Sequence, residues 1–249
     1  MRGKRALVTG AARGLGRAVA ALLVARGARV LIADLDGDVA AQVAADLGEA
    51  ARPVRCDVAD GGEVAAAVAT AVDLWGGLDV LVNNAGIEIG KPLVEHGEEE
   101  FGRLFDVNVK GVFHGIKHAT PVLADGGGAI VNMASVAGLA GAPLLGAYCA
   151  SKAAVLRLTE VAAIELRDHR IRVNAVCPSF IDTTMVERLV PKFETATGIP
   201  FGTLVALKQQ RLGAPEEVAE MVVFLASDDA EFINGAHYTL DGGLTGSLL

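Results

Sequence analysis

The residues with the clearest capacity for chemistry are Tyr148 and Lys152, in the segment Y-C-A-S-K. A spacing of four residues on a helix places both side chains on one face. A phenol with a pKa near ~10 is a poor base at neutral pH, so a working site must favour phenolate by roughly 3–4 kcal/mol. One unit charge at ~4 Å contributes roughly 4 kcal/mol at an effective dielectric of ~20. We therefore predict that Lys152 lowers the pKa of Tyr148, and that a positively charged cofactor ring adds to the effect.

Ser135 lies upstream of this pair, at the end of the apolar run A-I-V-N-M-A-S. A strand that ends there would present the hydroxyl at the carboxyl edge of a sheet, where it can hold a carbonyl or alcohol oxygen. The alternative, for an isolated Y-x-x-x-K motif, is that Tyr148 belongs to a core helix and that Ser135 merely ends a strand. The remaining motifs decide between these interpretations.

A glycine-rich turn follows the first apolar segment, at residues 6–9. Its spacing is G-x-x-x-G-x-G, at Gly10, Gly14 and Gly16, and a helix rich in Ala and Leu comes next. Glycine permits positive φ and lets the backbone approach a pyrophosphate, whose charge is met by the free N–H groups of the helix start. The spacing differs from the commoner G-x-G-x-x-G fingerprint, and glycine turns before helices also occur without a ligand.

Asp34 ends the second apolar segment, R-V-L-I-A-D. A carboxylate at this place can accept hydrogen bonds from ribose hydroxyls and would repel a 2′-phosphate, which favours NAD over NADP. Arg13, beside the second glycine, could receive that phosphate or could be a solvated loop charge. Because no Arg or Lys follows Asp34, the sequence predicts NAD as the preferred cofactor.

With these motifs the chain resembles a short-chain dehydrogenase/reductase along nearly its whole length. The resemblance also rests on N-N-A-G at 83–86, C-D-V at 56–58 and Asn108 in F-D-V-N-V. It implies that Asn108 kinks a helix and holds a water that links the lysine to solvent. The implied catalytic tetrad is Asn108, Ser135, Tyr148 and Lys152. The implied cofactor-binding residues are Gly10, Arg13, Gly14, Leu15, Gly16, Asp34, Asp57, Val58, Asn84, Ala85, Gly86, Tyr148, Lys152, Pro178, Ile181 and Thr183.

The segment P-S-F-I-D-T resembles the family's P-G-x-I-x-T. This resemblance implies that Ile181 and Thr183 lie near the nicotinamide, with Thr183 on its carboxamide, and that Asp57 touches the adenine. The departure is Ser179, where the family usually has glycine. Its side chain could narrow the nicotinamide pocket, bind substrate, or be a tolerated small residue.

These residues need a scaffold, and seven apolar segments that alternate with helical stretches supply it. Their runs show little polar alternation, which is typical of strands covered on both faces. We predict an α/β fold, a single-domain doubly wound parallel sheet of Rossmann type with helices on both faces, over residues 1–249. The region 179–212 breaks the alternation and is predicted to be a substrate-covering segment with short helices. The predicted strands are 5–9, 29–34, 53–57, 78–83, 129–135, 172–177 and 237–241.

Composition excludes several classes of partner. The net charge of −8, the absence of a basic cluster and an aromatic content of 4% argue against nucleic acid. The apolar runs are too short for a bilayer, and the chain enters its first strand directly, so we expect a cytoplasmic protein without a signal peptide. The three cysteines lack C-x-x-C spacing and fit reduced thiols. His114 and His118 are four residues apart but lack further ligands, so no metal is expected.

The function predicted from these observations is an NAD-dependent oxidoreductase for a secondary alcohol or its ketone. Ser135 would hold the substrate oxygen, Tyr148 would take its proton during oxidation, and Lys152 would hold the nicotinamide ribose. Within the same family the alternatives are a 3-oxoacyl-thioester reductase and a sugar or polyol dehydrogenase. An NAD-binding regulator without catalysis is the remote alternative from another class.

The substrate is expected to be mainly apolar, of cyclic or steroid-like size, because V-A-G-L-A-G-A-P-L-L follows Ser135. Phe180, Met185 and Phe193 could add apolar cover. We expect Glu88 to face solvent, since an unpaired carboxylate in an apolar pocket is costly; an inward Glu88 would favour a sugar or polyol. Finally, the resemblance implies a homotetramer, formed through helices around 102–123 and 148–167 and the end segment L-T-G-S-L-L.

Overall fold

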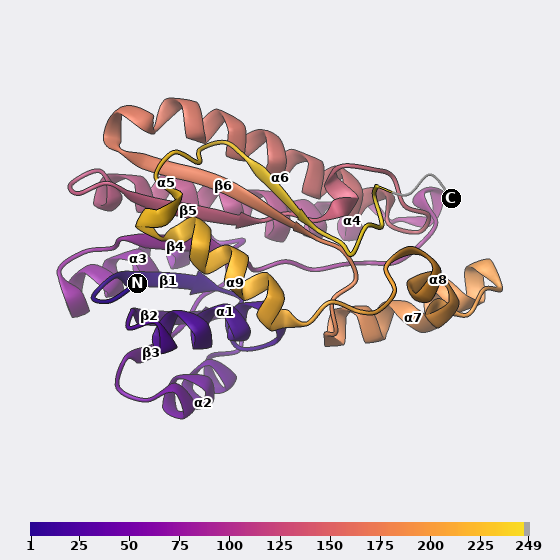
Figure 1. Cartoon of the computed structure of the whole chain (residues 1–249), viewed down its shortest axis with the longest axis horizontal. Coiled ribbons are helices and arrows are strands. Elements are labelled where there is room, and N and C mark those ends of the chain that lie inside the picture. The colour runs from indigo at the N-terminus through magenta and orange to yellow at the C-terminus, as the bar shows by residue number, and fades with distance from the viewer. Residues whose placement is uncertain (247–249) are drawn as a thin grey trace.

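A sheet of seven parallel strands forms the centre of the computed structural model, which describes residues 1–246. The order is β3-β2-β1-β4-β5-β6-β7, so the direction of winding reverses between β1 and β4 (Figure 1). In such sheets ligands bind beyond the carboxyl ends of the strands at this reversal. The strands are β1 Arg5–Thr9, β2 Arg29–Asp34, β3 Ala51–Arg55, β4 Val80–Asn83, β5 Gly128–Met133, β6 Ile171–Pro178 and β7 His237–Leu240.

Strand boundaries differ from the sequence prediction by one or two residues in β3 to β7, and the shifts in β3 and β5 affect the site. β3 occupies 51–55 and not 53–57, because its pairing with β2 runs from Val30 opposite Ala51 to Asp34 opposite Arg55. The strand predicted at 129–135 stops at residue 133, and Ser135 instead begins a 3₁₀ turn, Val136–Gly138. A boundary of this kind depends on the neighbouring strand, which the local sequence does not contain.

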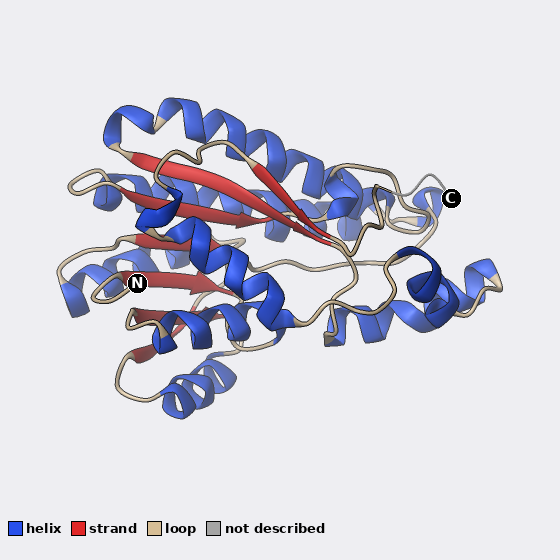
Figure 2. Cartoon of the chain, viewed as in Figure 1, coloured by secondary structure: helices blue, strands red, loops and turns tan. Residues whose placement is uncertain are grey.

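Helices cover both faces of the sheet, as predicted (Figure 2). Side chains that alternate along β2 enter both layers: Val30 and Ile32 join one core cluster, while Leu31 joins the other. This two-sided burial explains the uninterrupted apolar runs. One layer contains α1 Gly14–Ala25, α2 Gly37–Leu47 and α9 Pro215–Ala226, and the other contains α3 Gly61–Trp75, α5 Gly111–Leu123 and α6 Gly146–Glu165.

A π-helical turn, Asp106–Lys110, joins α4 (Glu98–Phe105) to α5. A single turn of π-helix inside a longer helix shifts the positions of the side chains that follow, and such turns are frequent at functional sites. Asn108 lies at its centre and is completely buried. The helix is therefore irregular at the asparagine, where the family resemblance implied a kink.

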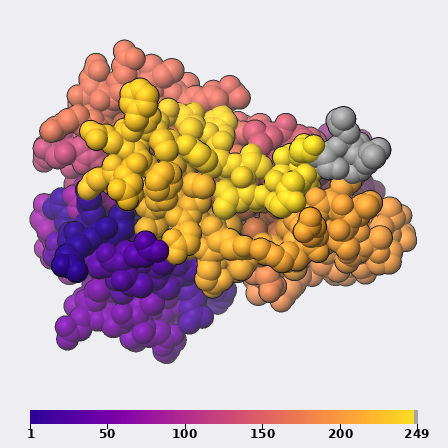
Figure 3. Space-filling model, in the orientation of Figure 1, coloured from indigo at the N-terminus to yellow at the C-terminus, as the bar shows by residue number. Residues whose placement is uncertain are grey.

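The region 179–212 forms α7 Thr184–Thr197 and α8 Phe201–Lys208. These two helices lie beyond the carboxyl ends of the strands (Figure 1) and make up the protruding orange end of the molecule in Figure 3. The last described residues of the chain approach the same end. Residues 247–249, part of the predicted L-T-G-S-L-L contact, lie outside the described residues.

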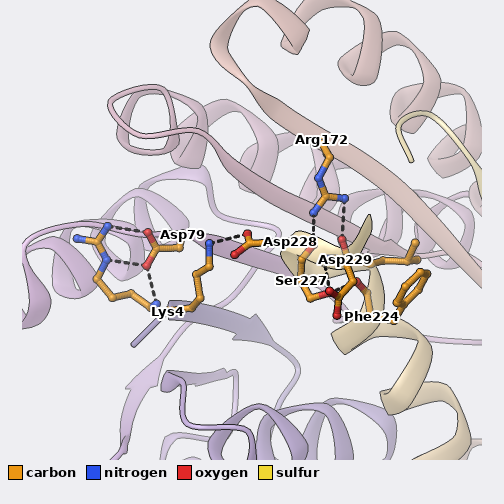
Figure 4. Close-up of polar contacts among 9 residues, drawn as sticks. Lys4, Asp79, Arg172, Phe224, Ser227, Asp228 and Asp229 are labelled. Carbon is orange, nitrogen blue, oxygen red and sulfur yellow. Dashed lines mark hydrogen bonds and ion pairs between the residues drawn. The ribbon is translucent and has the colours of Figure 1, made fainter. Parts of the chain in front are cut away.

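The opposite edge of the sheet is fixed by polar contacts (Figure 4). Arg5 forms a bidentate pair with Asp79, with both N···O distances at 2.8 Å. Arg172 donates to the carbonyl oxygens of Leu225 and Ser227, also at 2.8 Å. The first contact joins β1 to the residues before β4, and the second joins β6 to the end of α9. In the part of the chain that the structure describes, no helix is long and apolar enough to cross a membrane.

Candidate active site

Ser135, Tyr148 and Lys152 meet at the carboxyl edge of β5. Ser135 Oγ accepts from the backbone N–H of Ala137 at 3.2 Å, and Ser135 is near enough to the Tyr148 hydroxyl to lower its pKa. Lys152 Nζ lies 5.6 Å from the centre of the Tyr148 ring and donates to the Met133 carbonyl at 2.8 Å. The four-residue spacing on α6 thus brings the phenol and the ammonium to one place.

The electrostatics of the protein alone differ from the sequence expectation. Removal from water raises the pKa of Tyr148 to about 12, against the smaller lowering effect of its bond with Ser135. Burial also lowers the pKa of Lys152 to about 8, so Lys152 is mostly charged at neutral pH and loses its charge about one pH unit above it. In the chain alone burial outweighs any lowering of the Tyr148 pKa by Lys152, so the predicted effect of Lys152 together with a positively charged cofactor ring stays a prediction.

Asn108 connects three elements beside this pair. Its Oδ1 accepts from the Ile87 N–H at 2.8 Å, and its Nδ2 donates to the Ile87 carbonyl and to Ser151 Oγ, both at 3.0 Å. Gly86 lies between Asn108 and Lys152, because a Cβ added there would be 3.3 Å from Asn108 Oδ1 and 3.4 Å from Lys152 Nζ. Asn108 therefore fixes the segment after β4 against α6. The water relay remains a prediction from the resemblance.

The turn requires glycine, by its backbone conformation at Gly10 and Gly14 and by close packing at Gly10 and Gly16. Gly10 and Gly14 have φ of +61° and +52°, and a Cβ added at Gly16 would lie 2.2 Å from the Gly10 carbonyl oxygen. Asn84 Nδ2 donates to the carbonyls of Thr9 and Gly10, at 2.9 and 3.0 Å. Free N–H groups at the start of α1 face the same edge of the sheet, which suits a phosphate.

Thr9 supports the N-N-A-G segment beside this turn, and Asn83 links β4 to β5; the sequence analysis assigned neither residue a role. Thr9 Oγ1 accepts from the backbone N–H groups of Asn84 and Ala85, at 3.0 and 3.1 Å. Asn83, the first residue of N-N-A-G, donates to buried Asn132, which donates to Thr159 on α6. The first asparagine of the motif, Asn83, therefore has a structural role, and the second, Asn84, holds the glycine turn through its side-chain amide.

A wide hollow of about 660 Å³ lies beside Asp34, where the sequence analysis places the adenosine. Asp34 accepts from the N–H groups of Ala12 and Asp36, at 3.0 and 3.1 Å. Arg13 donates to Asp36 at 2.8 Å, so its charge is already paired. Arg55, which the sequence analysis did not consider, also lines the hollow but pairs with Glu63.

Other predicted cofactor residues lie nearby. Thr183 contacts the turn, since a Cβ at Gly14 would be 3.6 Å from its Cγ2, and its hydroxyl donates to the Ile181 carbonyl at 3.2 Å. Ile181 forms an isolated parallel bridge with Gly213. Leu15 is half-buried in the first turn of α1, and the Pro178 carbonyl accepts from Ser135 Oγ at 3.3 Å.

Asp57 and Val58 follow β3, and their side chains contact the next turn and α5. Asp57 Oδ1 accepts from the Ala59 N–H at 3.0 Å, and its side chain borders a separate hollow with Lys110. Val58 is buried against Gly111 of α5. Contact between Asp57 and an adenine thus remains a prediction.

A mainly apolar cavity of about 150 Å³ lies next to Ser135 and Tyr148. Its wall includes most of the stretch after Ser135, as well as Phe180 and Met185, which the sequence analysis placed there. Phe193 does not line it; its ring packs edge-on against Phe201, 5.6 Å away. The lining residues are Glu88, Ser135, Val136, Ala137, Ala140, Gly141, Ala142, Leu145, Tyr148, Ser179, Phe180, Met185, Val186, Leu189, Leu244 and Thr245.

Glu88 lines this cavity, so the expectation of a solvent-facing side chain was wrong. The side chain is only 6% exposed, and Lys192 Nζ on α7 lies 3.8 Å from Oε1. Burial raises the pKa of the Glu88 carboxyl, while Lys192 and Arg188 reduce the effect. The free-energy cost of burying an unpaired carboxylate is thus partly offset by the cations on α7, which lie more than ninety residues away in the sequence.

Ser179 has a definite partner. Its hydroxyl donates to Gln209 Oε1 at 2.7 Å, and Gln209 Nε2 donates to the carbonyls of Phe180 and Arg211. Gln209 is buried directly after α8. A serine where the resemblance expects glycine therefore joins the two ends of the segment that carries α7 and α8.

Comparison with known proteins agrees with this geometry. A family model described as Enoyl-(Acyl carrier protein) reductase matches residues 10–245. A sorbitol dehydrogenase of Cereibacter sphaeroides is 40% identical, with 97% of each chain covered. A 3-alpha-(or 20-beta)-hydroxysteroid dehydrogenase of Mycobacterium bovis is 41% identical over 99% of this chain and 91% of its own. The crystal structure of a short-chain type dehydrogenase/reductase from Mycobacterium marinum has a TM-score of 0.91 and 36% identity, over 99% of this chain and 97% of its own.

Fold, site and relatives together define an oxidoreductase of the doubly wound α/β class. A nicotinamide dinucleotide fits the residues present, because the side-chain-free turn at Gly16 and the Asp34 hollow lie along the same edge as Tyr148. The chain belongs to the short-chain dehydrogenase/reductase family.

Proposed function

We propose that this protein is an NAD-dependent dehydrogenase or reductase for a mainly apolar secondary alcohol and its ketone. One observation carries the proposal: Ser135, Tyr148 and Lys152 share the carboxyl edge of the sheet with the glycine turn, at the mouth of a mainly apolar cavity.

The side chains divide the work as follows. Ser135 binds the substrate oxygen, and Tyr148 takes its proton in oxidation and returns it in reduction. When bound, the nicotinamide ring exchanges a hydride with the reacting carbon and contributes a positive charge in its oxidised form. Lys152, held in place by the Met133 carbonyl, binds the nicotinamide ribose and supports the phenolate. Asn108 anchors the segment after β4 and the water that returns protons to solvent.

The NAD preference is supported by the charges around the adenosine hollow. Three carboxylates (Asp34, Asp36 and Asp38) and two arginines line it, and both arginines are paired with carboxylates. A 2′-phosphate would need to break one of these pairs while facing Asp34. A ribose hydroxyl needs only one acceptor oxygen.

The apolar substrate is supported by the cavity wall, in which Val136, Leu145 and Leu189 are typical members. Burial of apolar surface contributes about 25 cal/mol per Å², so such a wall binds a ring without fixed polar partners. One relative is named for a steroid and another for sorbitol, so the names of relatives alone do not select a substrate.

A cofactor-by-substrate matrix tests the proposal. Purified protein should oxidise cyclic secondary alcohols with a kcat/KM for NAD at least ~10-fold above that for NADP. Asp34→Ala should narrow this gap by removing the repulsion, while Asp73→Ala, an exposed charge on α3, serves as the control. Preferred use of NADP, or turnover limited to 3-oxoacyl thioesters, would contradict the proposal.

A further inference from the structure

Glu88 is the polar group of the cavity that the proposed reaction does not use. Its side chain is 6% exposed, and it lines the same cavity as Ser135 and Tyr148. The carboxylate interacts with the Gly90 N–H, yet among residues 1–246 its Oε1 atom has no hydrogen-bond partner. A buried carboxyl oxygen without a partner is uncommon in proteins and indicates a missing donor.

The carboxyl also lies within electrostatic reach of the reacting tyrosine. The negative charge of Glu88 is one of the causes that raise the pKa of Tyr148. Because Glu88 and Tyr148 line the same cavity of about 150 Å³, a ligand held at Tyr148 can extend to Glu88.

The other polar side chains of the wall are already engaged. Ser179 donates to Gln209 at 2.7 Å, and the Thr245 hydroxyl donates to Asp241. Ser135 and Tyr148 are reserved for the reacting oxygen. Within the described residues, Glu88 is thus the polar side chain of the wall that has no hydrogen-bond partner at Oε1, and the other side chains of the wall besides Ser135, Tyr148, Ser179 and Thr245 are aliphatic or aromatic.

The charges around Glu88 limit what that atom can bind. Lys192 lies 3.8 Å from Oε1, and Arg188 on the same helix also acts on the carboxyl. These two cations disfavour an ammonium ligand, and Glu88 itself disfavours a carboxylate ligand. Glu88 can bind a ligand hydroxyl in either protonation state, because a hydroxyl donates to a carboxylate and accepts from a carboxylic acid.

We propose that Glu88 binds a second hydroxyl on a mainly apolar substrate, so that the enzyme prefers diols and hydroxyketones to compounds with one oxygen. This inference rests on the proposed function and defines its substrate more narrowly. A fully hydroxylated chain fits less well, because one acceptor would leave its other hydroxyls against apolar surface at a cost for each.

The test compares cyclohexanol with the isomeric cyclohexanediols, each assayed with NAD. At least one diol should show a kcat/KM at least ~10-fold above that of cyclohexanol, because hydrogen bonds to charged groups are strong. The gain should lie mainly in KM, since the second hydroxyl is remote from the reacting carbon.

Two variants test whether the higher kcat/KM for the diol depends on Glu88. Glu88→Met removes both oxygens at similar length, and the diol advantage should fall to within about 2-fold. Glu88→Gln keeps a neutral hydrogen-bonding group and should retain an intermediate advantage. Glu99→Met, the same exchange at an exposed position of α4, should leave the ratio unchanged. Thermal melting and NADH binding establish that each variant is folded.

The outcomes separate this inference from the proposed function. Equal use of cyclohexanol and every diol by the unmodified enzyme overturns the role of Glu88 and leaves the dehydrogenase assignment standing. A diol preference that survives unchanged in Glu88→Met also overturns it, as does an unchanged preference in Glu88→Gln if the methionine variant does not fold. Failure of the unmodified enzyme to oxidise any member overturns the proposed function itself, and the inference with it.

Discussion

Tyr148 shows how far a single residue depends on its surroundings. In the protein alone its pKa is raised to about 12, while the pKa of Lys152 is lowered to about 8. Both shifts have burial as their largest cause. At neutral pH the pocket by itself keeps Tyr148 uncharged, while Lys152 with a pKa of about 8 is still mostly protonated. The proposed reaction therefore requires a further positive charge at the site, which fits an oxidised nicotinamide ring.

Removal of the Tyr148 hydroxyl tests the proton step. Tyr148→Phe keeps the ring and its packing, and kcat should fall by at least ~10²-fold, the usual contribution of a general acid or base. Affinity for NADH, measured by fluorescence titration, should change little because the glycine turn and the Asp34 hollow are untouched. Retention of most of the kcat would exclude Tyr148 as the proton carrier.

At the scale of elements, the contact between Ser179 and Gln209 fixes the helices that cover the cavity. Ser179 follows β6 and Gln209 follows α8, so their hydrogen bond closes the base of the segment between them. A net contribution of about 1 kcal/mol for such a bond corresponds to about a 5-fold change in the local opening equilibrium.

Ser179→Ala should therefore loosen this segment without unfolding the sheet. We expect proteolytic cleavage within 184–208 to become about 5-fold faster and the KM for the alcohol to rise. Thr203→Ala, at an exposed position of α8, is the control. Cleavage rates that are the same in both variants would show that the contact does not hold the segment.

The elements also explain which parts of the site the sequence could predict. The glycine turn and the pair on α6 are local motifs, and the structure brings them to one edge as expected. Glu88 and Phe193 were misplaced because their neighbours come from α7 and α8, whose packing has no local signal. Arg55 was overlooked because β3 begins two residues earlier than predicted, and only its pairing with β2 fixes that register.

At the scale of the whole molecule, apolar side chains on α4, α5 and α6 are exposed to solvent. Phe113 is 47% exposed, and Val161 and Ile164, on one face of α6, are 50% and 64% exposed. A monomer would leave this surface in water, whereas paired copies bury it. The family resemblance predicts a homotetramer formed through these helices.

Light scattering coupled to gel filtration tests the assembly. The unmodified protein should elute as a tetramer at micromolar concentration, and Ile164→Asp should shift it toward smaller species, since a charge at such an interface is costly. Leu207→Asp, on α8, is the matched control because its side chain is also exposed. A monomeric unmodified protein would reject the prediction.

The inward position of Glu88 has a consequence for the free energy of unfolding. Its pKa is raised in the folded chain above the usual value of 4.5. A group of this kind favours the fold most at low pH, and its contribution is lost as the pH rises through the raised pKa.

Glu88→Gln should therefore melt at a higher temperature than the unmodified protein at neutral pH, by roughly 2–4 °C for each kcal/mol of added stability. The difference should shrink as the pH falls toward 4.5, and a difference independent of pH in thermal melts would contradict this account. Selection for thermostability alone would then discard Glu88, and with it the substrate preference it confers, so the residue marks a trade-off between robustness and recognition.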